Sequence, residues 1–332
     1  MRSRILPGSW GSLGDNMNLR AHVLGCSALV VLCAPDAARA ATDPPRAPWG
    51  GYSYAASYDA EIADPDVHRV LYEDDNVMFL EVANPPGLDV KMHGHPYPSV
   101  FARDAGAGPT TAGVAIQDDL LDPKGLFNGE GWGQGPPPKG LPFPRCTTSP
   151  PQGPHKPINK SEVPVHFYRI EFRRLDGEEI ATRWKEWYPW MRESPKGVTN
   201  AARPAMDSIA AAPDNYRLLY EDGHVRLVEV GVRPGETTPR HAHLYSSVLA
   251  FNAPTAVNDA GEGAGRAPAP SVFGMKLPLC ATSAAQPPHA IQNTGAAPLH
   301  YYRIEFKRVD GDDFRTGWRK WYPWMKYMQY MR

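Results

Sequence analysis

The chain carries the segment "HFYRIEFRRLDG" at residues 166–177 and repeats it almost unchanged as "HYYRIEFKRVDG" at residues 300–311. Each copy is followed by a related tryptophan-rich segment, "WKEWYPWM" from Trp184 and "WRKWYPWM" from Trp318. Further upstream, "LYED" at residues 71–74 returns at residues 219–222. Because a repeat of such long period bears on the fold more than any local motif does, the sequence predicts two copies of one structural plan.

The repeat sets the expected domain organisation. We expect a signal peptide and N-terminal extension at residues 1–40, a first module at 41–192, a polar, alanine-rich linker at 193–213 and a second module at 214–332. Equivalent histidines lie 148 residues apart at His93 and His241 but 134 apart at His155 and His289. The first copy is therefore longer, and the excess falls in a Pro- and Gly-rich stretch at residues 118–144, which predicts a long loop at the mouth of the barrel.

The N-terminal region resembles a secretory signal. Residues 23–33 are apolar, and Ala38-Arg39-Ala40 offers small residues for cleavage near Ala40, which predicts a periplasmic or secreted protein. The apolar run is too short to span a bilayer, so we expect no transmembrane segment. The net charge of the chain is −1, and no basic run interleaved with aromatics is present, which argues against nucleic acid as a partner.

Two cysteines, Cys146 and Cys280, remain after removal of the signal. Both lie at the same distance before the histidine of the later motif, so they are equivalent positions of the repeat. Two cysteines are too few for a disulfide scaffold. A bond between them would require both to lie near the axis that relates the two copies, and we expect two separate thiols instead.

Short segments rich in β-branched and aromatic residues recur in both copies. They lie at residues 77–82, 167–172, 225–230 and 301–306, and Gly, Pro or Asp residues bound them, as is typical of strands. No apolar run of helical period exceeds a few turns. The sequence therefore predicts an all-β protein of two tandem barrels with short peripheral helices.

Histidines are the residues that point to chemistry. His93 and His95 are two apart, as are His241 and His243, and residues two apart in a strand face the same side. A third histidine follows in each copy, His155 in the first and His289 in the second. Imidazole suits transition metals, and three protein ligands leave positions open for water, dioxygen or a substrate.

These motifs resemble those of the cupin superfamily. The first cupin motif, a glycine followed after five residues by His-x-His, is met at Gly87 and at Gly235, and the second, a histidine with an asparagine four residues on, is met at His155 and His289. The resemblance covers most of the mature chain and implies a bicupin, with two double-stranded β-helix (jelly-roll) barrels. The family's usual glutamate is replaced by serine at Ser99 and Ser247, which implies either a neutral three-histidine site like those of some cupin dioxygenases or a weakened site that binds no metal.

The resemblance implies a function as well as a fold. The expected cofactor is a divalent transition metal (Fe, Cu, Ni, Mn or Zn), and the expected ligands are His93, His95, His155, His241, His243 and His289. An oxygenase acting on a small organic substrate is the first hypothesis. A bicupin that binds a metal or small ligand without turnover is the second, and an exported structural protein with relic histidines is the third.

Other residues are candidates for the pocket. They are Tyr97, Tyr245, His166, His300, Tyr168, Tyr302, Ser99 and Ser247. The first two tyrosines have the parity to face inward and to orient a substrate, or only to fill the barrel. His166 with Tyr168, and likewise His300 with Tyr302, could hydrogen-bond the ligating imidazoles or form an ordinary strand face. We expect Arg169 with Glu171, and Arg303 with Glu305 in the second copy, to form surface or inter-module ion pairs. We interpret the tryptophan segments as packing elements or as carbohydrate platforms.

Overall fold

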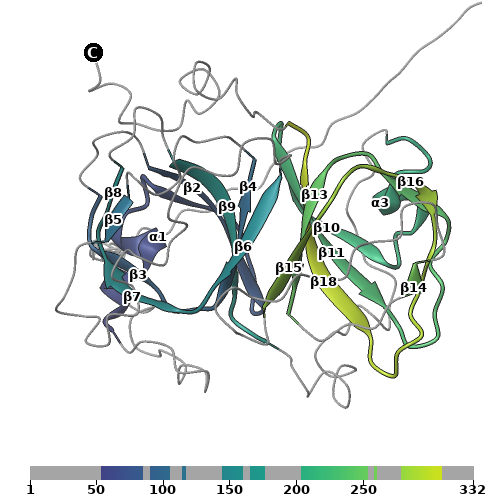
Figure 1. Ribbon diagram of the computed structural model, residues 1–332, viewed down its shortest axis with the longest axis horizontal. Helices are drawn as coiled ribbons and strands as arrows, with labels where there is room; N and C mark the ends of the chain where they lie inside the picture. Colours follow the sequence, from purple (N-terminus) through teal and green to yellow (C-terminus); the bar gives the residue numbers. More distant parts are fainter. Residues whose placement is uncertain are drawn as a thin grey trace, which may run out of the picture. The chain divides into compact units, whose positions relative to one another are not determined.

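The computed structural model describes residues 54–84, 90–104, 114–116, 144–159, 165–175, 203–252, 258–259 and 278–308. These residues are mostly strands (Figure 1). Their helical segments are η2 (Ala56–Tyr58), α1 (Ala60–Ala63) and α3 (Ser208–Ala211). The predicted all-β fold with short helices is confirmed. In the described part of the chain, no helix has the length and apolar character needed to cross a membrane.

The N-terminal module is an all-antiparallel barrel of nine strands. They are β1 (His68–Glu73), β2 (Val77–Asn84), β3 (His93–His95), β4 (Ser99–Arg103), β5 (Val114–Ile116), β6 (Arg145–Ser149), β7 (Gln152–His155), β8 (Pro157–Asn159) and β9 (Val165–Phe172). One sheet has the order β1-β2-β9-β4-β6, and the smaller pairs β3-β7 and β5-β8 complete the module.

The C-terminal module repeats this plan. Its strands are β10 (Tyr216–Glu221), β11 (Val225–Val232), β12 (His241–His243), β13 (Ser247–Phe251), β14 (Asn258–Asp259), β15 (Leu279–Ser283), β16 (Gln286–His289), β17 (Ile291–Gln292) and β18 (Leu299–Phe306). The large sheet has the equivalent order β10-β11-β18-β13-β15. Even the irregularities agree, since the register shifts between Val70 and Tyr72 in one module and between Leu218 and Tyr220 in the other. The structure thus shows two tandem barrels built on one plan.

The hairpins that open each module are set by an aspartate. The Asp74 carboxylate accepts hydrogen bonds from the backbone N–H groups of Asn76 and Val77, at 2.8 and 2.9 Å, and so fixes the turn between β1 and β2. Asp222 makes the same pair of bonds to His224 and Val225. The repeated "LYED" therefore marks two copies of one turn.

Both modules belong to one compact unit, residues Pro44–Arg332, and share a hydrophobic core. That core joins β2 and β9 to β11 and β18. Aromatic rings meet across it: Tyr168 lies 5.7 Å from Phe306, and Phe172 lies 5.9 Å from Tyr302. As a result, the central strands β2, β9, β11 and β18 are buried on both faces, one against their own barrel interior and one against the other module.

The expectation of two separate thiols is wrong. Cys146 on β6 and Cys280 on β15 form a disulfide, with a Cα–Cα distance of 6.2 Å. The strands β6 and β15 occupy equivalent positions at the edges of their sheets and lie side by side. Because the sheets pack against each other, equivalent residues on those strands come close to the axis relating the modules, which is the geometry that a bond between them requires.

Residues 203–213 fall in the segment that the sequence assigned to the linker, yet they include α3. The Asp207 side chain accepts a hydrogen bond from the backbone of Ile209 and caps this short helix. Ile209 is buried in the core of the C-terminal module. The signal segment, the long loop at residues 118–143 and the tryptophan segments lie outside the described residues.

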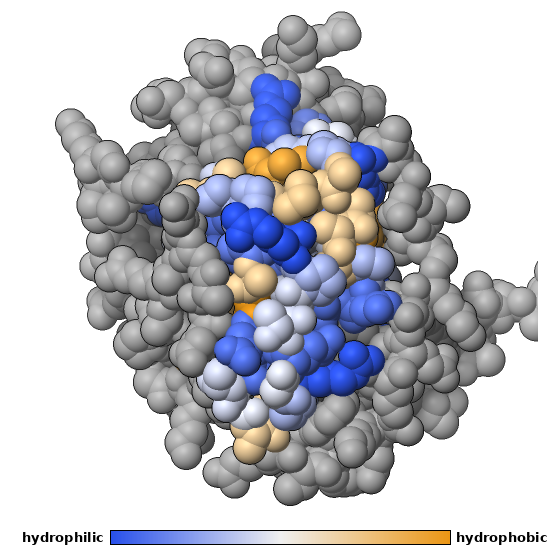
Figure 2. Space-filling model, turned by 90° about the vertical axis from the view of Figure 1, so that its right-hand side faces the viewer, coloured by the Kyte–Doolittle hydropathy of each residue, from blue (hydrophilic) through white to orange (hydrophobic). Residues whose placement is uncertain are grey.

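The outer surface of the described residues is mixed. Figure 2 shows hydrophilic residues and a smaller hydrophobic group on one face of the molecule. The large apolar side chains that are exposed are Tyr58, Ile62, Val70, Met206 and Leu244. Isolated exposed apolar side chains are common on protein surfaces. The unusual polar residues of the described chain are the buried ones, which include the histidines of both His-x-His pairs.

Candidate metal centre

Strand pairing brings the histidines of each module together. β3 pairs with β7 so that His93 lies opposite His155, and β12 pairs with β16 so that His241 lies opposite His289. In the C-terminal module, His241, His243 and His289 each present one ligand atom, and these atoms lie within 4.8 Å of one another. All three side chains are buried. The sequence predicted this trio as metal ligands, and its geometry fits one ion.

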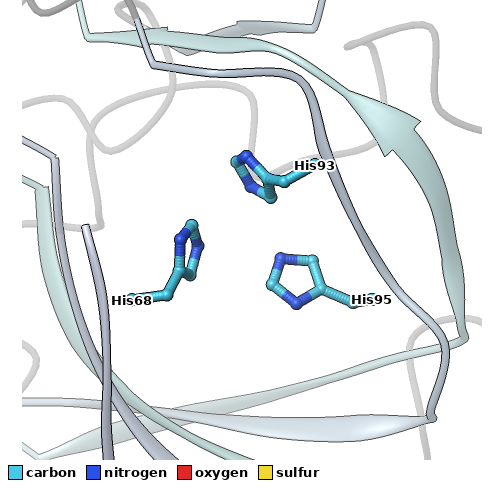
Figure 3. A group of neighbouring side chains, drawn as sticks. All are labelled: His68, His93 and His95. Atoms are coloured by element: carbon cyan, nitrogen blue, oxygen red, sulfur yellow. The ribbon is translucent and has the colours of Figure 1, made fainter. Parts of the chain in front are cut away.

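The N-terminal module places an additional histidine in its site. The group whose ligand atoms lie within 4.8 Å of one another is His68, His93 and His95 (Figure 3). His155 is beside them, with its ring centroid 4.6 Å from that of His93 and 5.5 Å from that of His95. Each module thus contains a buried three-histidine group that fits metal binding, and the N-terminal module gathers four imidazoles.

His68 was not predicted as a ligand from the sequence. It is the first residue of β1, ahead of the conspicuous "LYED" repeat, and its equivalent 148 residues later is Tyr216 rather than a histidine. Comparing the histidines of the two copies does not find His68, because its equivalent is not a histidine. The signal that would have found it is strand parity, since His68 lies directly opposite Val82, an interior residue of β2.

Backbone carbonyls fix the tautomer of four of the histidines. The Nδ1 atoms bond the carbonyl two residues earlier in four cases: His93 to Lys91 at 2.8 Å, His155 to Gly153 at 2.9 Å, His241 to Pro239 at 2.8 Å and His289 to Pro287 at 2.8 Å. A carbonyl can only accept, so each Nδ1 carries the proton and each Nε2 keeps its lone pair. In the C-terminal module, the Nε2 atoms of His243 and His289 are buried without a hydrogen-bond partner, as expected of nitrogens that coordinate an ion.

A turn positions the first histidine pair of the C-terminal module. The Glu236 N–H donates to the Arg233 carbonyl at 3.0 Å, and between them Gly235 has φ = 78°. A type II turn needs a positive φ at this place, which glycine adopts without strain. The glycine of the first cupin motif therefore has a backbone role here, because it turns the chain into β12.

A buried carboxylate orients the second histidine of each pair. His95 Nδ1 is 2.7 Å from Glu171 Oε1, and the Arg169 Nε atom is 2.9 Å from the same oxygen. Neither Arg169 nor Glu171 is more than 1% exposed. The expectation of a surface or inter-module ion pair is wrong, because alternate residues of β9 face the barrel interior and these two are among them. Glu171 is the partner that holds the ring of a histidine in the three-histidine group.

The equivalent carboxylate in the C-terminal module has a further partner. His243 Nδ1 is 3.0 Å from Glu305 Oε1, and Arg303 lies 3.0 Å from that oxygen. The other oxygen of Glu305 bonds Arg226, which also bonds Asp207 at 2.8 Å. The position equivalent to Arg226 in the first module is Met78, so the second guanidinium is specific to the C-terminal site.

Charge and burial set the ionisation of these groups. Burial lowers the pKa of His68 to about 3 and that of His155 to about 4, and it also holds the pKa values of His93, His95 and His243 well below the usual value. These imidazoles are therefore neutral at pH 7, which is the form that binds metal.

The two carboxylates differ in acidity. Burial raises the pKa of Glu171 to about 8, against the opposing charge of Arg169. Burial acts on Glu305 too, but its hydrogen bond with His243 and the charges of Arg303 and Arg226 outweigh it and lower the pKa to about 2. The carboxylate beside the C-terminal histidines is thus held ionised by its surroundings.

The predicted serines lie next to these carboxylates. Ser99 is opposite Glu171 across β4 and β9, and Ser247 is opposite Glu305 across β13 and β18. Both serines are fully buried, and their hydroxyl oxygens have no hydrogen-bond partner. The small serine leaves room beside the glutamate of the facing strand.

The other predicted pocket residues lie farther out. The guanidinium of Arg173 lies 5.9 Å from the centre of the Tyr97 ring, and that of Arg226 lies 5.1 Å from the Tyr245 ring. Tyr245 is therefore linked to the C-terminal histidines through Arg226 and Glu305. Tyr97 contacts an arginine that binds Glu73 on β1.

His166 and Tyr168 lie on the face of β9 that turns toward the other module. His166 Nδ1 is 2.9 Å from Asp104 and its Nε2 is 3.1 Å from Glu81, so both ring nitrogens meet carboxylates. Burial disfavours the charged ring, but the two carboxylates outweigh it and raise the pKa of His166 to about 10. The Tyr168 ring stacks on Phe79.

The second module places the equivalent pair in the same way. His300 Nδ1 lies 2.8 Å from Asn252 and its Nε2 lies 3.0 Å from Glu229. An amide thus replaces one of the two carboxylates. Tyr302 packs in the core that joins the modules.

Comparisons with known proteins identify no family for this chain. No family model matches, and neither does any curated protein. Among solved structures, the chain is similar to a cupin domain from Bordetella pertussis, with 18% identity over 28% of this chain and 91% of that one and a TM-score of 0.21. A variant of oxalate decarboxylase from Bacillus subtilis shows 12% identity, covers 70% of this chain and 69% of that one and has a TM-score of 0.21. A variant of salicylate 1,2-dioxygenase from Pseudoaminobacter salicylatoxidans shows 11% identity, the same coverage and a TM-score of 0.22. These similarities are too weak to indicate what this chain does.

Proposed function

We propose that this chain is an exported bicupin that binds a divalent transition metal ion in each module and acts as an oxygenase on a small organic substrate. The observation that carries the proposal is the trio His241, His243 and His289, whose ligand atoms lie within 4.8 Å of one another inside a barrel. The Nδ1 atoms of all three are occupied by carbonyl or carboxylate partners, so the Nε2 atoms are available to the ion.

The surrounding residues support binding of a metal rather than a purely structural role. A buried imidazole without a partner costs free energy unless something satisfies its nitrogen. In the C-terminal module this applies to the Nε2 atoms of His243 and His289. The nitrogen-only ligand set suits Fe, Cu, Ni, Mn or Zn better than Ca²⁺ or Mg²⁺, which prefer oxygen.

The chemistry expected at the site follows from its charge. Three neutral imidazoles leave the full charge of a divalent ion in place, so an anionic small molecule is the expected substrate. When bound, the ion supplies Lewis acidity and, if it is iron or copper, electron transfer. The barrel residues would hold the ligating rings in place and exclude bulk water, and Glu305 would keep the proton of His243 on Nδ1.

Export is part of the proposal. The disulfide between Cys146 and Cys280 supports it, because structural disulfides persist in oxidising compartments such as the periplasm. The apolar segment that ends before Ala38-Arg39-Ala40 would direct the chain there, with cleavage near Ala40.

The depth of the histidines favours a second candidate function. The six predicted ligands are 0–7% exposed, which suits a protein that retains an ion or small ligand without turnover. The two functions differ in their consequences: an oxygenase consumes dioxygen in the presence of its metal and substrate, whereas a binding protein retains its ligand and consumes none.

Elemental analysis of the exported protein tests metal binding, which both candidate functions require. We expect about two metal ions per chain, one from each site. His241→Ala should lose about one of them, and His224→Ala, which removes a histidine of the same module outside the site, should lose none. Dioxygen uptake across a set of small organic anions then separates the oxygenase from the binding protein. Unchanged metal content in His241→Ala would remove the basis of both.

A further inference from the structure

The two sites differ at one position of an otherwise matching framework. The first residue of the first strand is His68 in the N-terminal module and Tyr216 in the C-terminal module. Both are paired with an equivalent valine of the next strand, Val82 and Val230. The two side chains therefore enter their barrels at the same place, and one is a metal ligand type while the other is a phenol.

Ring positions agree closely between the modules. The His68 ring centroid is 4.4 Å from that of His93 and 5.3 Å from that of His95. The Tyr216 ring is 4.5 Å from that of His241 and 5.4 Å from that of His243. His68 thus occupies, relative to the His-x-His pair, the place that a phenol fills in the other copy.

In the N-terminal module, the rings of His68 and His155 each lie about as far from those of His93 and His95 as rings do in a tetrahedral site. With metal–nitrogen bonds of about 2.0–2.1 Å, imidazole centroids in such a site lie about 5 Å apart. The centroid distances from His93 to His95 and His155 are 5.2 and 4.6 Å, and the distances involving His68 fall on either side of 5 Å. A fourth nitrogen ligand is therefore compatible with the positions of the other three.

A hydrogen-bond network holds His68 in place beside His93. The Asp64 carbonyl accepts from the His68 ring at 3.3 Å, and the Asp64 carboxylate accepts from the Lys91 N–H at 2.9 Å. The Lys91 carbonyl in turn accepts from His93 Nδ1 at 2.8 Å. Asp64 thus helps to position the rings of both His68 and His93.

The C-terminal module lacks the parts of this network. The residues equivalent to Asp64 and Lys91 are Ala212 and Pro239, which supply neither the carboxylate nor the N–H. The backbone bond from Tyr216 to Ala212 is kept at 3.0 Å, matching the bond from His68 to Asp64. This backbone hydrogen bond is therefore the same in both modules, but the side-chain network through Asp64 is present only in the module that has His68.

We infer that the N-terminal module holds its ion with four imidazoles, those of His68, His93, His95 and His155, and leaves no position for an outside ligand, whereas the C-terminal ion keeps an open position beside Tyr216 for a small anion. The inference rests on the proposed metal binding of both modules. Four-coordinate nitrogen and sulfur sites are typically structural, and sites with three protein ligands are typically catalytic. The N-terminal module would thus retain its ion as a structural site, and the C-terminal module would expose its ion to a substrate.

Cobalt and azide test this division without knowledge of the substrate. The chelator-stripped protein is loaded with Co²⁺ and its visible absorption is followed during addition of azide. His241→Ala leaves only the N-terminal site, and the double variant His93→Ala/His95→Ala leaves only the C-terminal site, because replacing His93 alone would leave three imidazoles in the N-terminal module. We expect azide to change the spectrum of His93→Ala/His95→Ala and to leave that of His241→Ala unchanged.

Exchange variants check that His68 is the cause. In the His241→Ala background, His68→Tyr should make the N-terminal site respond to azide. Loss of an outer partner already weakens metal binding about 10–100-fold, so loss of the ligand itself should lower Co²⁺ affinity by more than about tenfold. In the His93→Ala/His95→Ala background, Tyr216→His should suppress the azide response. Circular dichroism of each variant establishes that it is folded, and His68→Gln serves if the tyrosine is not accommodated.

The outcomes separate the two proposals. Equal azide responses from the two sites, or unchanged Co²⁺ affinity in His68→Tyr, would overturn the four-imidazole assignment while metal binding itself stands. Failure of the unmodified protein to bind Co²⁺ would overturn both. In the unmodified protein with both sites loaded, only the C-terminal part of the cobalt spectrum should shift with azide.

Discussion

Ser99 and Glu171 face each other across β4 and β9, and the Glu171 side chain hydrogen-bonds the ring of His95. The same relationship joins Ser247 and Glu305. Each module thus has a glutamate that hydrogen-bonds a histidine ring. The three-histidine groups that fit metal binding offer nitrogen ligands only.

The first prediction concerns this carboxylate. Glu305→Gln keeps an acceptor for His243 Nδ1 but removes the negative charge that makes the imidazole a stronger base, and Glu305→Ala removes both. We expect metal affinity to fall about tenfold for the first and up to about 100-fold for the second. Titration of the stripped protein with Co²⁺ measures both values.

A matched control for that experiment is Glu221→Gln. Glu221 is a partly exposed glutamate of the same module that pairs with Arg203 and Lys307, away from the histidines. Its replacement should leave metal affinity unchanged. Equal affinity of Glu305→Ala and the unmodified protein would show that the carboxylate has no part in holding the ligand.

The second prediction concerns pH and His166. Its pKa is about 10 in the folded protein because Asp104 and Glu81 flank the buried ring, whereas an unfolded histidine has its ordinary value near 6.5. A raised folded-state pKa contributes stability that is fully present below about pH 6.5 and is lost as the pH rises through about 10. Asp104→Asn should therefore destabilise the protein at pH 6 by an amount on the order of a few kcal/mol, and by much less above pH 10.

Urea unfolding at a series of pH values measures that difference. Asp104→Asn reproduces the arrangement of the other module, where Asn252 already occupies the equivalent place beside His300, so the side chain is compatible with the fold. A destabilisation that does not change between pH 6 and pH 10 would contradict the assignment of a charged His166.

The third prediction concerns the disulfide. Cys146 and Cys280 are separated by 134 residues, and their bond joins the two modules. Replacing both by alanine should lower the free energy of unfolding by roughly 2–4 kcal/mol. A reductant should lower the melting temperature of the unmodified protein but not that of the double variant. A reductant effect of equal size in both proteins would point to some other cause.

Much of the fold follows from the repeat alone. The segments at residues 77–82, 167–172, 225–230 and 301–306 all lie in long strands, β2, β9, β11 and β18. The His-x-His pairs lie on short strands opposite the third histidine, as the motif spacing indicated. These features depend on local sequence patterns, which repeat in both copies and so reinforce each other.

What the sequence did not reveal depends on packing between distant segments. On β9, His166 and Tyr168 alternate with Arg169 and Glu171, and both sets are largely buried because β9 lies between its own barrel and the other module. A period of two separates the faces but does not say which face is the barrel interior. For the same reason, the disulfide could not be anticipated before the packing of the two sheets was known.

The central claim is that each module gathers its imidazoles around one ion. Anomalous X-ray diffraction from crystals of the protein loaded with Co²⁺ or Zn²⁺, recorded on either side of the metal's absorption edge, tests it directly. The account predicts one strong peak inside each barrel, about 2.0–2.1 Å from the Nε2 atoms of His241, His243 and His289 in one and of His68, His93, His95 and His155 in the other. Barrels without such a peak, in crystals whose metal lies only on the outer surface, would contradict it.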